Sequence, residues 1–254
     1  MSEVSEQELG AIDERIAAFR ARLDAACVQA GREPSEVALI AVTKNHPPEY
    51  ALQALRSGLL ELGENRPQDL IAKRDGVEQL DPGLAARARW HFIGRLQRNK
   101  AKQVVAAADM VHSIDRVAVA EAVAKAATGS DRWSAATPLP VLLQVNLDPA
   151  APREEHDSTA SRGGVHPLEM SQLAARVAEH DELRVAGLMA IAPLDHDPGE
   201  CFARLAELSM QLRLDHPAAD IISAGMTGDF PAAVANGATH VRVGTALFGE
   251  RQLA

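Results

Sequence analysis

The sequence predicts a single closed (β/α)₈ barrel preceded by one extra helix. Eight short apolar runs recur along the chain, and alanine-rich amphipathic segments separate them. Such alternation is typical of parallel strands joined by helices, and eight units in about 220 residues suit a closed barrel. An open doubly wound sheet is the alternative. The runs cover residues 37–42, 59–63, 90–94, 110–114, 140–146, 185–191, 220–225 and 240–244.

The extra helix is expected at about residues 7–30. Ile12, Ile16, Phe19, Leu23 and Cys27 recur at spacings of three and four, and Gly31 follows as a stop signal. Clear helical patterns between the runs cover residues 117–127 and 169–180. We therefore expect one domain over residues 1–254, with the barrel at about 37–250.

Composition excludes several classes of protein. The 254 residues are 46% hydrophobic, carry a net charge of −9 and contain no basic block, so we expect no nucleic-acid partner. The acidic N-terminus does not resemble a signal peptide, and no apolar run reaches transmembrane length. Cys27 and Cys201 are far apart in the sequence and are expected to be reduced core thiols. These features predict a cytoplasmic protein with no membrane partner.

Polar residues follow the runs at the end where such barrels place their active sites. Lys44 ends the first run, and Asn65 ends the "GEN" that follows the second. Apolar surroundings would lower the pKa of the lysine and leave a neutral amine, which condenses with an aldehyde to a Schiff base. A lysine that merely extends its amine to solvent at a strand end is the alternative.

The loops after the last two runs have the features of a phosphate site. "SAGMTGDF" offers the hydroxyls of Ser223 and Thr227, and its glycines let backbone N–H groups approach an anion. "GTALFG" places Gly244 and Thr245 at an expected helix start. Ordinary glycine turns are the alternative. A phosphate site opposite a reactive lysine suits pyridoxal 5′-phosphate (PLP) or a sugar phosphate.

Several long motifs resemble those of the pyridoxal phosphate homeostasis proteins. They are "LIAVTK", "LGENRPQDL", "WHFIGRLQRNK", "HSIDR", "GLMAI" and "SAGMTGDFPAAVANGATHVRVGTALFG". The resemblance covers roughly residues 10–250 and implies a PLP-binding barrel of fold type III, similar to the N-terminal domain of alanine racemase.

The resemblance also implies roles for individual residues. The lysine that carries PLP as a Schiff base matches Lys44, and the asparagine beside the cofactor matches Asn65. The phosphate contacts match Ser223, Thr227, Gly244 and Thr245. The arginine that faces the pyridine nitrogen matches Arg242. Arginine only donates hydrogen bonds, so that nitrogen stays unprotonated and the ring is a weaker electron sink.

The chain departs from the family pattern at two places. Arg66 and Pro67 follow "GEN", where many members have an aromatic and an aliphatic residue. Arg162 replaces a loop lysine within residues 148–164, a long segment rich in proline, serine and charge. An arginine can hold a phosphate but cannot form the Schiff base, so a role of that lysine in passing PLP is in doubt here.

Three functions are considered. The first is a PLP carrier without its own turnover, a monomer that limits free PLP or delivers it to apo PLP-dependent enzymes. The second is a PLP-dependent amino-acid racemase, which needs an acid/base on each face of its substrate; the one tyrosine, Tyr50, is expected to pack on the helix after Lys44. The third is a sugar-phosphate aldolase that forms a Schiff base. The carrier is preferred, with no catalytic residues.

Other polar residues receive structural interpretations. No HxH or HExxH pattern predicts a metal site. His91 and His112 are expected to make structural hydrogen bonds inside the barrel rather than approach the cofactor. Glu64 is expected to orient Asn65 or Lys44, or to pair with an arginine such as Arg95.

Overall fold

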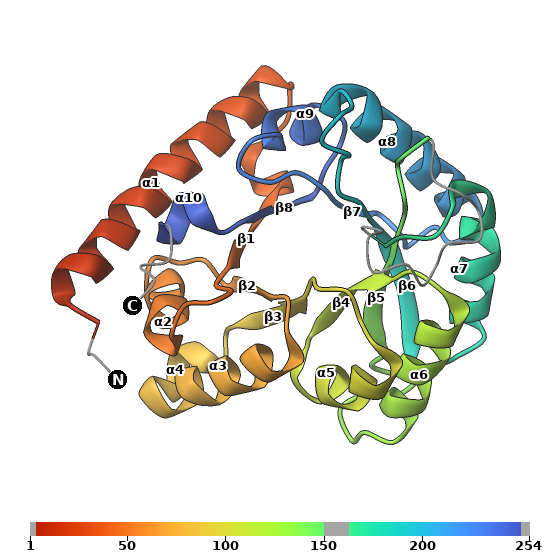
Figure 1. Cartoon of the computed structure of the whole chain (residues 1–254), viewed down its shortest axis with the longest axis horizontal. Helices are drawn as coiled ribbons and strands as arrows, with labels where there is room; N and C mark the ends of the chain where they lie inside the picture. Colours follow the sequence, from red (N-terminus) through yellow and green to blue (C-terminus); the bar gives the residue numbers. More distant parts are fainter. Residues whose placement is uncertain (1–3, 150–162, 250–254) are drawn as a thin grey trace.

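A computed structural model describes residues 4–149 and 163–249 and forms a closed barrel (Figure 1). Each strand is parallel to its neighbours, and β1 closes the barrel by pairing with β8. The predicted barrel is therefore confirmed, and the open sheet is excluded. The strands are β1 (Ala38–Val42), β2 (Glu61–Glu64), β3 (Arg89–Phe92), β4 (Met110–Ile114), β5 (Leu139–Gln144), β6 (Leu183–Met189), β7 (Ile221–Ser223) and β8 (His240–Val243).

Helices surround the barrel on its outside (Figure 1). They are α1 (Glu6–Gln29), α2 (Pro48–Arg56), α3 (Pro67–Leu80), α4 (Pro82–Ala85), α5 (Ala101–Ala107), α6 (Val117–Thr128), α7 (Met170–Ala178), α8 (Pro198–Asp215), α9 (Phe230–Ala235) and α10 (Thr245–Phe248). Short 3₁₀ turns are η1 (Pro34–Glu36), η2 (Arg98–Lys100) and η3 (Pro167–Glu169). None of these helices is long and apolar enough to cross a membrane.

The predicted N-terminal helix is confirmed as α1. A capping box between Ser5 and Glu8 satisfies its first N–H groups. At the other end Gly31 takes a left-handed φ of 68°, which ends the helix. The apolar stripe packs on α9, where the Phe19 and Phe230 rings lie 4.9 Å apart. α1 therefore covers the outside of the barrel near its seam between β8 and β1.

The remaining sequence expectations have mixed outcomes. Cys27 and Cys201 are free and buried, as expected. Helices α6 and α7 match the predicted segments within a few residues. Most of the 148–164 segment, including Arg162, lies outside the described residues, and the division of residues 1–254 into one domain stays a prediction.

Candidate functional site

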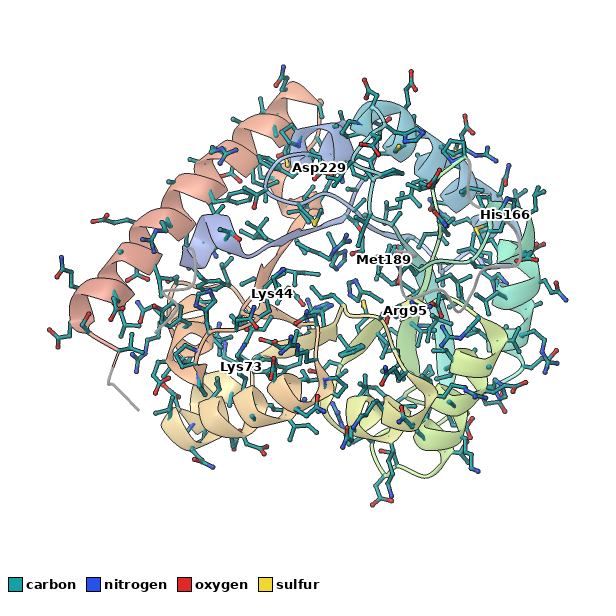
Figure 2. All side chains as sticks on the ribbon, viewed as in Figure 1. Lys44, Lys73, Arg95, His166, Met189 and Asp229 are labelled. Carbon is teal, nitrogen blue, oxygen red and sulfur yellow. The ribbon has the colours of Figure 1, made fainter. Side chains whose placement is uncertain are left out.

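Lys44 lies two residues beyond β1, at the carboxyl-terminal mouth of the barrel (Figure 2). Its turn is fixed by backbone hydrogen bonds: Thr43 N donates to Gly63 O at 3.2 Å, and His46 N donates to Thr43 O at 3.1 Å. Asn45 closes the turn with a left-handed φ of 64°. Lys44 is exposed, so the expectation that apolar surroundings bury its amine is wrong. The strand ends before the lysine, and the turn lifts the side chain out of the core.

The buried amine beside this turn belongs to Lys73 of α3. Its Nζ donates to Thr43 O and pairs with Glu64 at the end of β2, and the Thr43 hydroxyl donates to the same carboxylate oxygen. Burial lowers the pKa of Lys73 and raises the pKa of Glu64. The second oxygen of Glu64 is buried and has no hydrogen-bond partner among the described residues. This cluster fixes the carbonyl directly before Lys44.

Glu64 therefore does not pair with Arg95, and that expectation is wrong. Arg95 lies instead near Asp115, with 3.9 Å between Nε and Oδ2. Lys73 was missed in the sequence because α3 has a mixed polar pattern. A signal existed, since Leu70, Lys73 and Val77 recur at helical spacing and all three are buried.

Asn65 follows β2 directly and is exposed at the same mouth. Gly94, just after β3, lets the two loops approach, because a Cβ at this position would overlap the carbonyl oxygen of Asn65. The unexpected pair after Asn65 has a local explanation: Arg66 is the N-cap residue of α3 and Pro67 is its first residue. Proline suits that position, since it has no N–H to leave unpaired.

The loops after β7 and β8 expose backbone N–H groups at neighbouring strand ends. Thr227 and Gly228 precede α9, and Thr245 and Ala246 begin α10; none of these four N–H groups has an acceptor among the described residues. Gly244 is the N-cap residue of α10 and packs against Val42, so this loop adjoins the end of β1. The arrangement can accept an anion at the Lys44 mouth.

Gly225 explains why the loop after β7 needs glycine. Its φ is 89°, and a Cβ would lie 2.7 Å from the Ala233 side chain. Its carbonyl accepts from Arg242 N at 3.0 Å, which ties the loop to β8. The backbone of Thr227 and Gly228 is therefore presented by a rigid turn.

Arg242 is buried inside the barrel near this end. Its Nη1 donates to Ser223 O and to Ser223 Oγ, both at 2.7 Å, and its Nη2 donates to Ala190 O at 2.9 Å. Burial lowers the pKa of Arg242 to about 10, so it remains a cation at neutral pH. Its Nε–H and one Nη2–H have no acceptor among the described residues and can serve a ligand.

The structure places the predicted residues in two settings. Lys44, Asn65, Thr227, Gly244 and Thr245 follow the carboxyl ends of β1, β2, β7 and β8, with their side chains or backbone at least partly exposed. The Ser223 side chain lies in the interior, where it contacts Arg242 and His112.

The two barrel histidines make the structural hydrogen bonds expected of them. His91 Nδ1 lies 2.9 Å from His112 Nε2, and His91 Nε2 lies 2.6 Å from Glu61. In the described part of the chain, no group of three His, Cys, Asp or Glu residues has an arrangement suited to a metal ion.

Tyr50 lies on α2, as expected. Its ring stacks on His46 at 4.7 Å between centroids and lies 6.1 Å from the Phe248 ring. Its hydroxyl has no hydrogen-bond partner among the described residues.

Comparison with known proteins places this barrel in a family. The profile of the alanine racemase N-terminal domain matches residues 15–252. A pyridoxal phosphate homeostasis protein of Mycobacterium tuberculosis is 37% identical over 243 residues, which cover 94% of this chain and 92% of the relative. A protein of the same name from Escherichia coli K12 is 36% identical over 248 residues, with 94% and 97% covered.

Solved structures agree. PipY of Synechococcus elongatus, determined with PLP bound, is 33% identical and superposes with a TM-score of 0.76, covering 94% of this chain and 100% of PipY. Sequence and fold thus lead to one conclusion. This chain belongs to the pyridoxal phosphate homeostasis protein family, within the wider group that shares the alanine racemase N-terminal domain.

Proposed function

We propose that this protein binds PLP as a Schiff base on Lys44 and limits or delivers the free cofactor without catalytic turnover of its own. The observation that carries the proposal is the meeting of three kinds of group at one mouth of the barrel. An exposed amine follows β1, unpaired backbone N–H groups follow β7 and β8, and a buried guanidinium with free donors lies on β8.

Each kind of group suits one part of PLP. Bound PLP supplies an aldehyde carbon, and the Lys44 amine is the nucleophile that condenses with it. The N–H groups of Thr227, after β7, and of Thr245, next to Gly244 after β8, suit the phosphate. Asn65, held by the close approach of Gly94, can hydrogen-bond the ring substituents. The relatives named for PLP homeostasis, and PipY with PLP bound, support this assignment.

Arg242 supports a carrier rather than an enzyme. Its free N–H groups can only donate, so they favour an unprotonated pyridine nitrogen. A ring in that state withdraws electrons weakly, and it stabilises a substrate carbanion poorly. A racemase also needs a second acid/base. Tyr50, the candidate considered from the sequence, packs against His46 and Phe248.

The proposal includes partners and location. A protein that holds a reactive aldehyde reversibly is suited to supply apo PLP-dependent enzymes, and we propose these as partners. Free, buried Cys27 and Cys201 favour a reducing compartment, so we propose the cytoplasm. We propose a monomer, which light scattering on the PLP-loaded protein would test.

The test of the Schiff base uses borohydride. The purified protein is mixed with PLP, its visible spectrum is recorded, the adduct is reduced, and the modified lysine is located by mass spectrometry. We expect one adduct, on Lys44, and none in Lys44→Ala. Lys102→Ala, which removes an exposed lysine of α5, is the matched control and should load like the wild type.

Lys73 makes the test stringent, because a second amine lies next to the site. Its ion pair with Glu64 should keep it unmodified. A protein without an adduct on Lys44, or with the adduct on Lys73, would overturn the assignment.

A further inference from the structure

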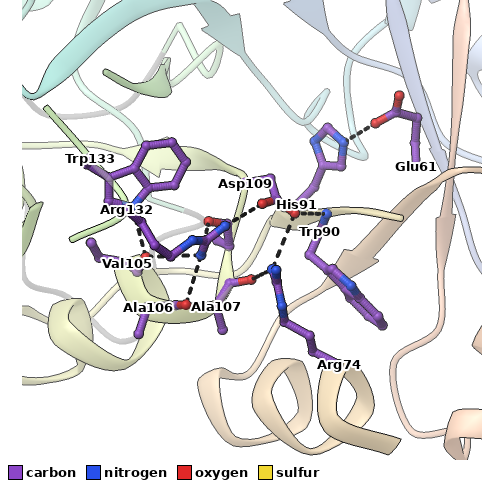
Figure 3. Close-up of polar contacts among 11 residues, drawn as sticks. Glu61, Arg74, Trp90, His91, Val105, Ala106, Ala107, Asp109, Arg132 and Trp133 are labelled. Carbon is purple, nitrogen blue, oxygen red and sulfur yellow. Dashed lines mark hydrogen bonds and ion pairs between the residues drawn. The ribbon is translucent and has the colours of Figure 1, made fainter. Parts of the chain in front are cut away.

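An unbroken line of hydrogen bonds crosses the barrel interior from β8 to β2. Arg242 Nη1 donates to Ser223 Oγ at 2.7 Å, and Ser223 Oγ lies 3.0 Å from His112 Nδ1. The line continues from His112 Nε2 to His91 Nδ1 at 2.9 Å, and from His91 Nε2 to Glu61 Oε2 at 2.6 Å. Figure 3 shows the last of these contacts. All five residues are buried.

The line connects the two ends of the barrel. Ser223 is the last residue of β7, at the mouth that carries Lys44. Glu61 is the first residue of β2, and its carboxylate pairs with Arg89, the first residue of β3, whose side chain is 69% exposed. The interior of the candidate site is therefore linked to a charged group near solvent at the opposite mouth.

The proton positions along this line follow from its chemistry. Burial holds the pKa of His112 well below its usual range, so this ring is neutral with one N–H. Ser223 Oγ already accepts from Arg242 Nη1, and we assign its hydroxyl hydrogen to His112 Nδ1, the ring nitrogen 3.0 Å away. His112 must then carry its hydrogen on Nε2 and donate to His91 Nδ1.

The same reasoning gives the proton positions on His91 and Glu61, the second half of the line. Because His91 Nδ1 accepts, His91 carries its hydrogen on Nε2 and donates to Glu61. Burial alone would raise the pKa of Glu61, but its hydrogen bond from His91 and its pairing with Arg89 lower it overall, so Glu61 is ionised. Every bond therefore points the same way, from the guanidinium to the carboxylate, and each polarises the next.

We propose that Glu61, His91 and His112 are positioning residues for Arg242: through Ser223, they orient its guanidinium toward the ring nitrogen of the cofactor. The proposal rests on the proposed function, since it assumes that PLP occupies this mouth. In this arrangement the Ser223 hydroxyl donates its hydrogen to His112 and accepts from Arg242, so it has no hydrogen left for the phosphate. Phosphate binding is then left to the backbone N–H groups.

The need for such a relay follows from the surroundings of Arg242. No carboxylate pairs with it directly in the described residues; Asp229 acts on its pKa only through charge. A buried guanidinium without a contacting anion depends on neutral acceptors to hold its orientation. The polarised line gives Ser223 Oγ more negative character than an isolated hydroxyl would have.

The first experiment needs no cofactor. Nitrogen-15 NMR of the unliganded protein reports which ring nitrogen of each histidine carries hydrogen. We expect the Nε2–H form for both His91 and His112 at neutral pH. An Nδ1–H form of His112 would reverse the line and overturn the proposal.

The second experiment uses the PLP-loaded protein. Glu61→Gln keeps an acceptor for His91 but removes the charge, and Ser223→Ala breaks the line beside Arg242. We expect a shifted absorbance maximum of bound PLP in both variants, and about a tenfold loss of PLP affinity in Ser223→Ala, as for loss of a hydrogen bond to a charged group. A purely structural role would leave the absorbance maximum in place.

His240→Asn is the matched control. His240 lies in the same interior, with its ring 6.1 Å from that of His91, but its Nδ1 bonds to Thr239 Oγ1 at 2.9 Å and it stands outside the line. Its spectrum and affinity should match the wild type. A folded Glu61→Gln protein that also matches the wild type would overturn the proposal. Failure of the wild type to load PLP on Lys44 would instead overturn the proposed function. The nitrogen-15 NMR of His91 and His112 would still test the line of hydrogen bonds, because it needs no PLP.

Discussion

At the ends of β1 and β2, Lys73 and Glu64 are charges in direct contact, whereas Arg242 and Glu61 are charges separated by three neutral groups. The first arrangement is compact and fixes one carbonyl, that of Thr43. The second extends over five strands and fixes a guanidinium. A contact pair depends on both partners being present, while an extended line depends on where its protons are. We therefore expect substitutions at the pair to lower stability, and changes in protonation to perturb the line.

The largest effect is expected from breaking the contact pair. Lys73→Ala leaves Glu64 buried without its cation, and we expect a loss of about 3–5 kcal/mol in the free energy of unfolding. Urea denaturation measures it. The double variant Lys73→Met with Glu64→Leu should recover most of the loss, because it removes both charges. A loss below about 1 kcal/mol would mean that the pair is not a structural clamp.

The pH dependence of that variant sharpens the result. Without Lys73, burial raises the pKa of Glu64 further above its unfolded value. A group with a raised folded pKa contributes stability that is present below the unfolded pKa and is lost as the pH rises through the folded value. Lys73→Ala should therefore be least impaired near pH 4.5, the unfolded value, and more impaired as the pH rises through the raised folded pKa. The wild type should show the same dependence in a weaker form, because Lys73 opposes the rise in the pKa of Glu64.

The next effect concerns the loop beside this pair. Gly94→Ala places a methyl group against the carbonyl oxygen of Asn65, and we expect a loss of about 1–3 kcal/mol in stability from overpacking. Because Asn65 must move, PLP affinity should also fall at least about tenfold, or 1.4 kcal/mol. Gly10→Ala in α1, where a Cβ meets nothing within 4 Å, is the matched control and should be neutral or stabilising. Equal affinity in both variants would remove Asn65 from the site.

The histidines of the barrel interior, His112 in the line and His240 beside it, should make stability sensitive to acid instead. Burial lowers the pKa of His240 to about 4 and that of His112 well below 6.5, so the unfolded chain binds more protons than the folded one between pH 6.5 and 4. Stability is then complete above pH 6.5 and falls as the pH drops through this window, by up to about 1.4 kcal/mol per pH unit for each histidine. His240→Asn should reduce that slope. An unchanged slope would mean that His240 titrates normally.

The two regions also differ in how far the sequence predicts them. All eight strands follow from apolar runs of the right length, because a parallel barrel buries both faces of each strand. Lys44 and Asn65 follow from their place after those runs. Lys73 does not, since its role depends on a side chain that reaches from α3 to the ends of β1 and β2. The line through Ser223 is harder still, because its neighbours are 19 and 111 residues away. Such contacts depend on barrel closure and on proton positions, and neither can be predicted from the pattern of residues within one segment of the sequence.

The smallest effect separates carrier from racemase. Tyr50→Phe removes a hydroxyl that has no partner in the described residues and keeps the ring against His46 and Phe248, so stability should change by less than about 0.5 kcal/mol. Burial raises the pKa of the phenol, so it is protonated at neutral pH and is a poor base. We expect equal PLP loading in both proteins and no exchange of the α-hydrogen of L-alanine in deuterated water, followed by NMR. Exchange by the wild type that Tyr50→Phe abolishes would contradict the carrier, because it would mean that this phenol reaches the substrate despite its stacking on His46.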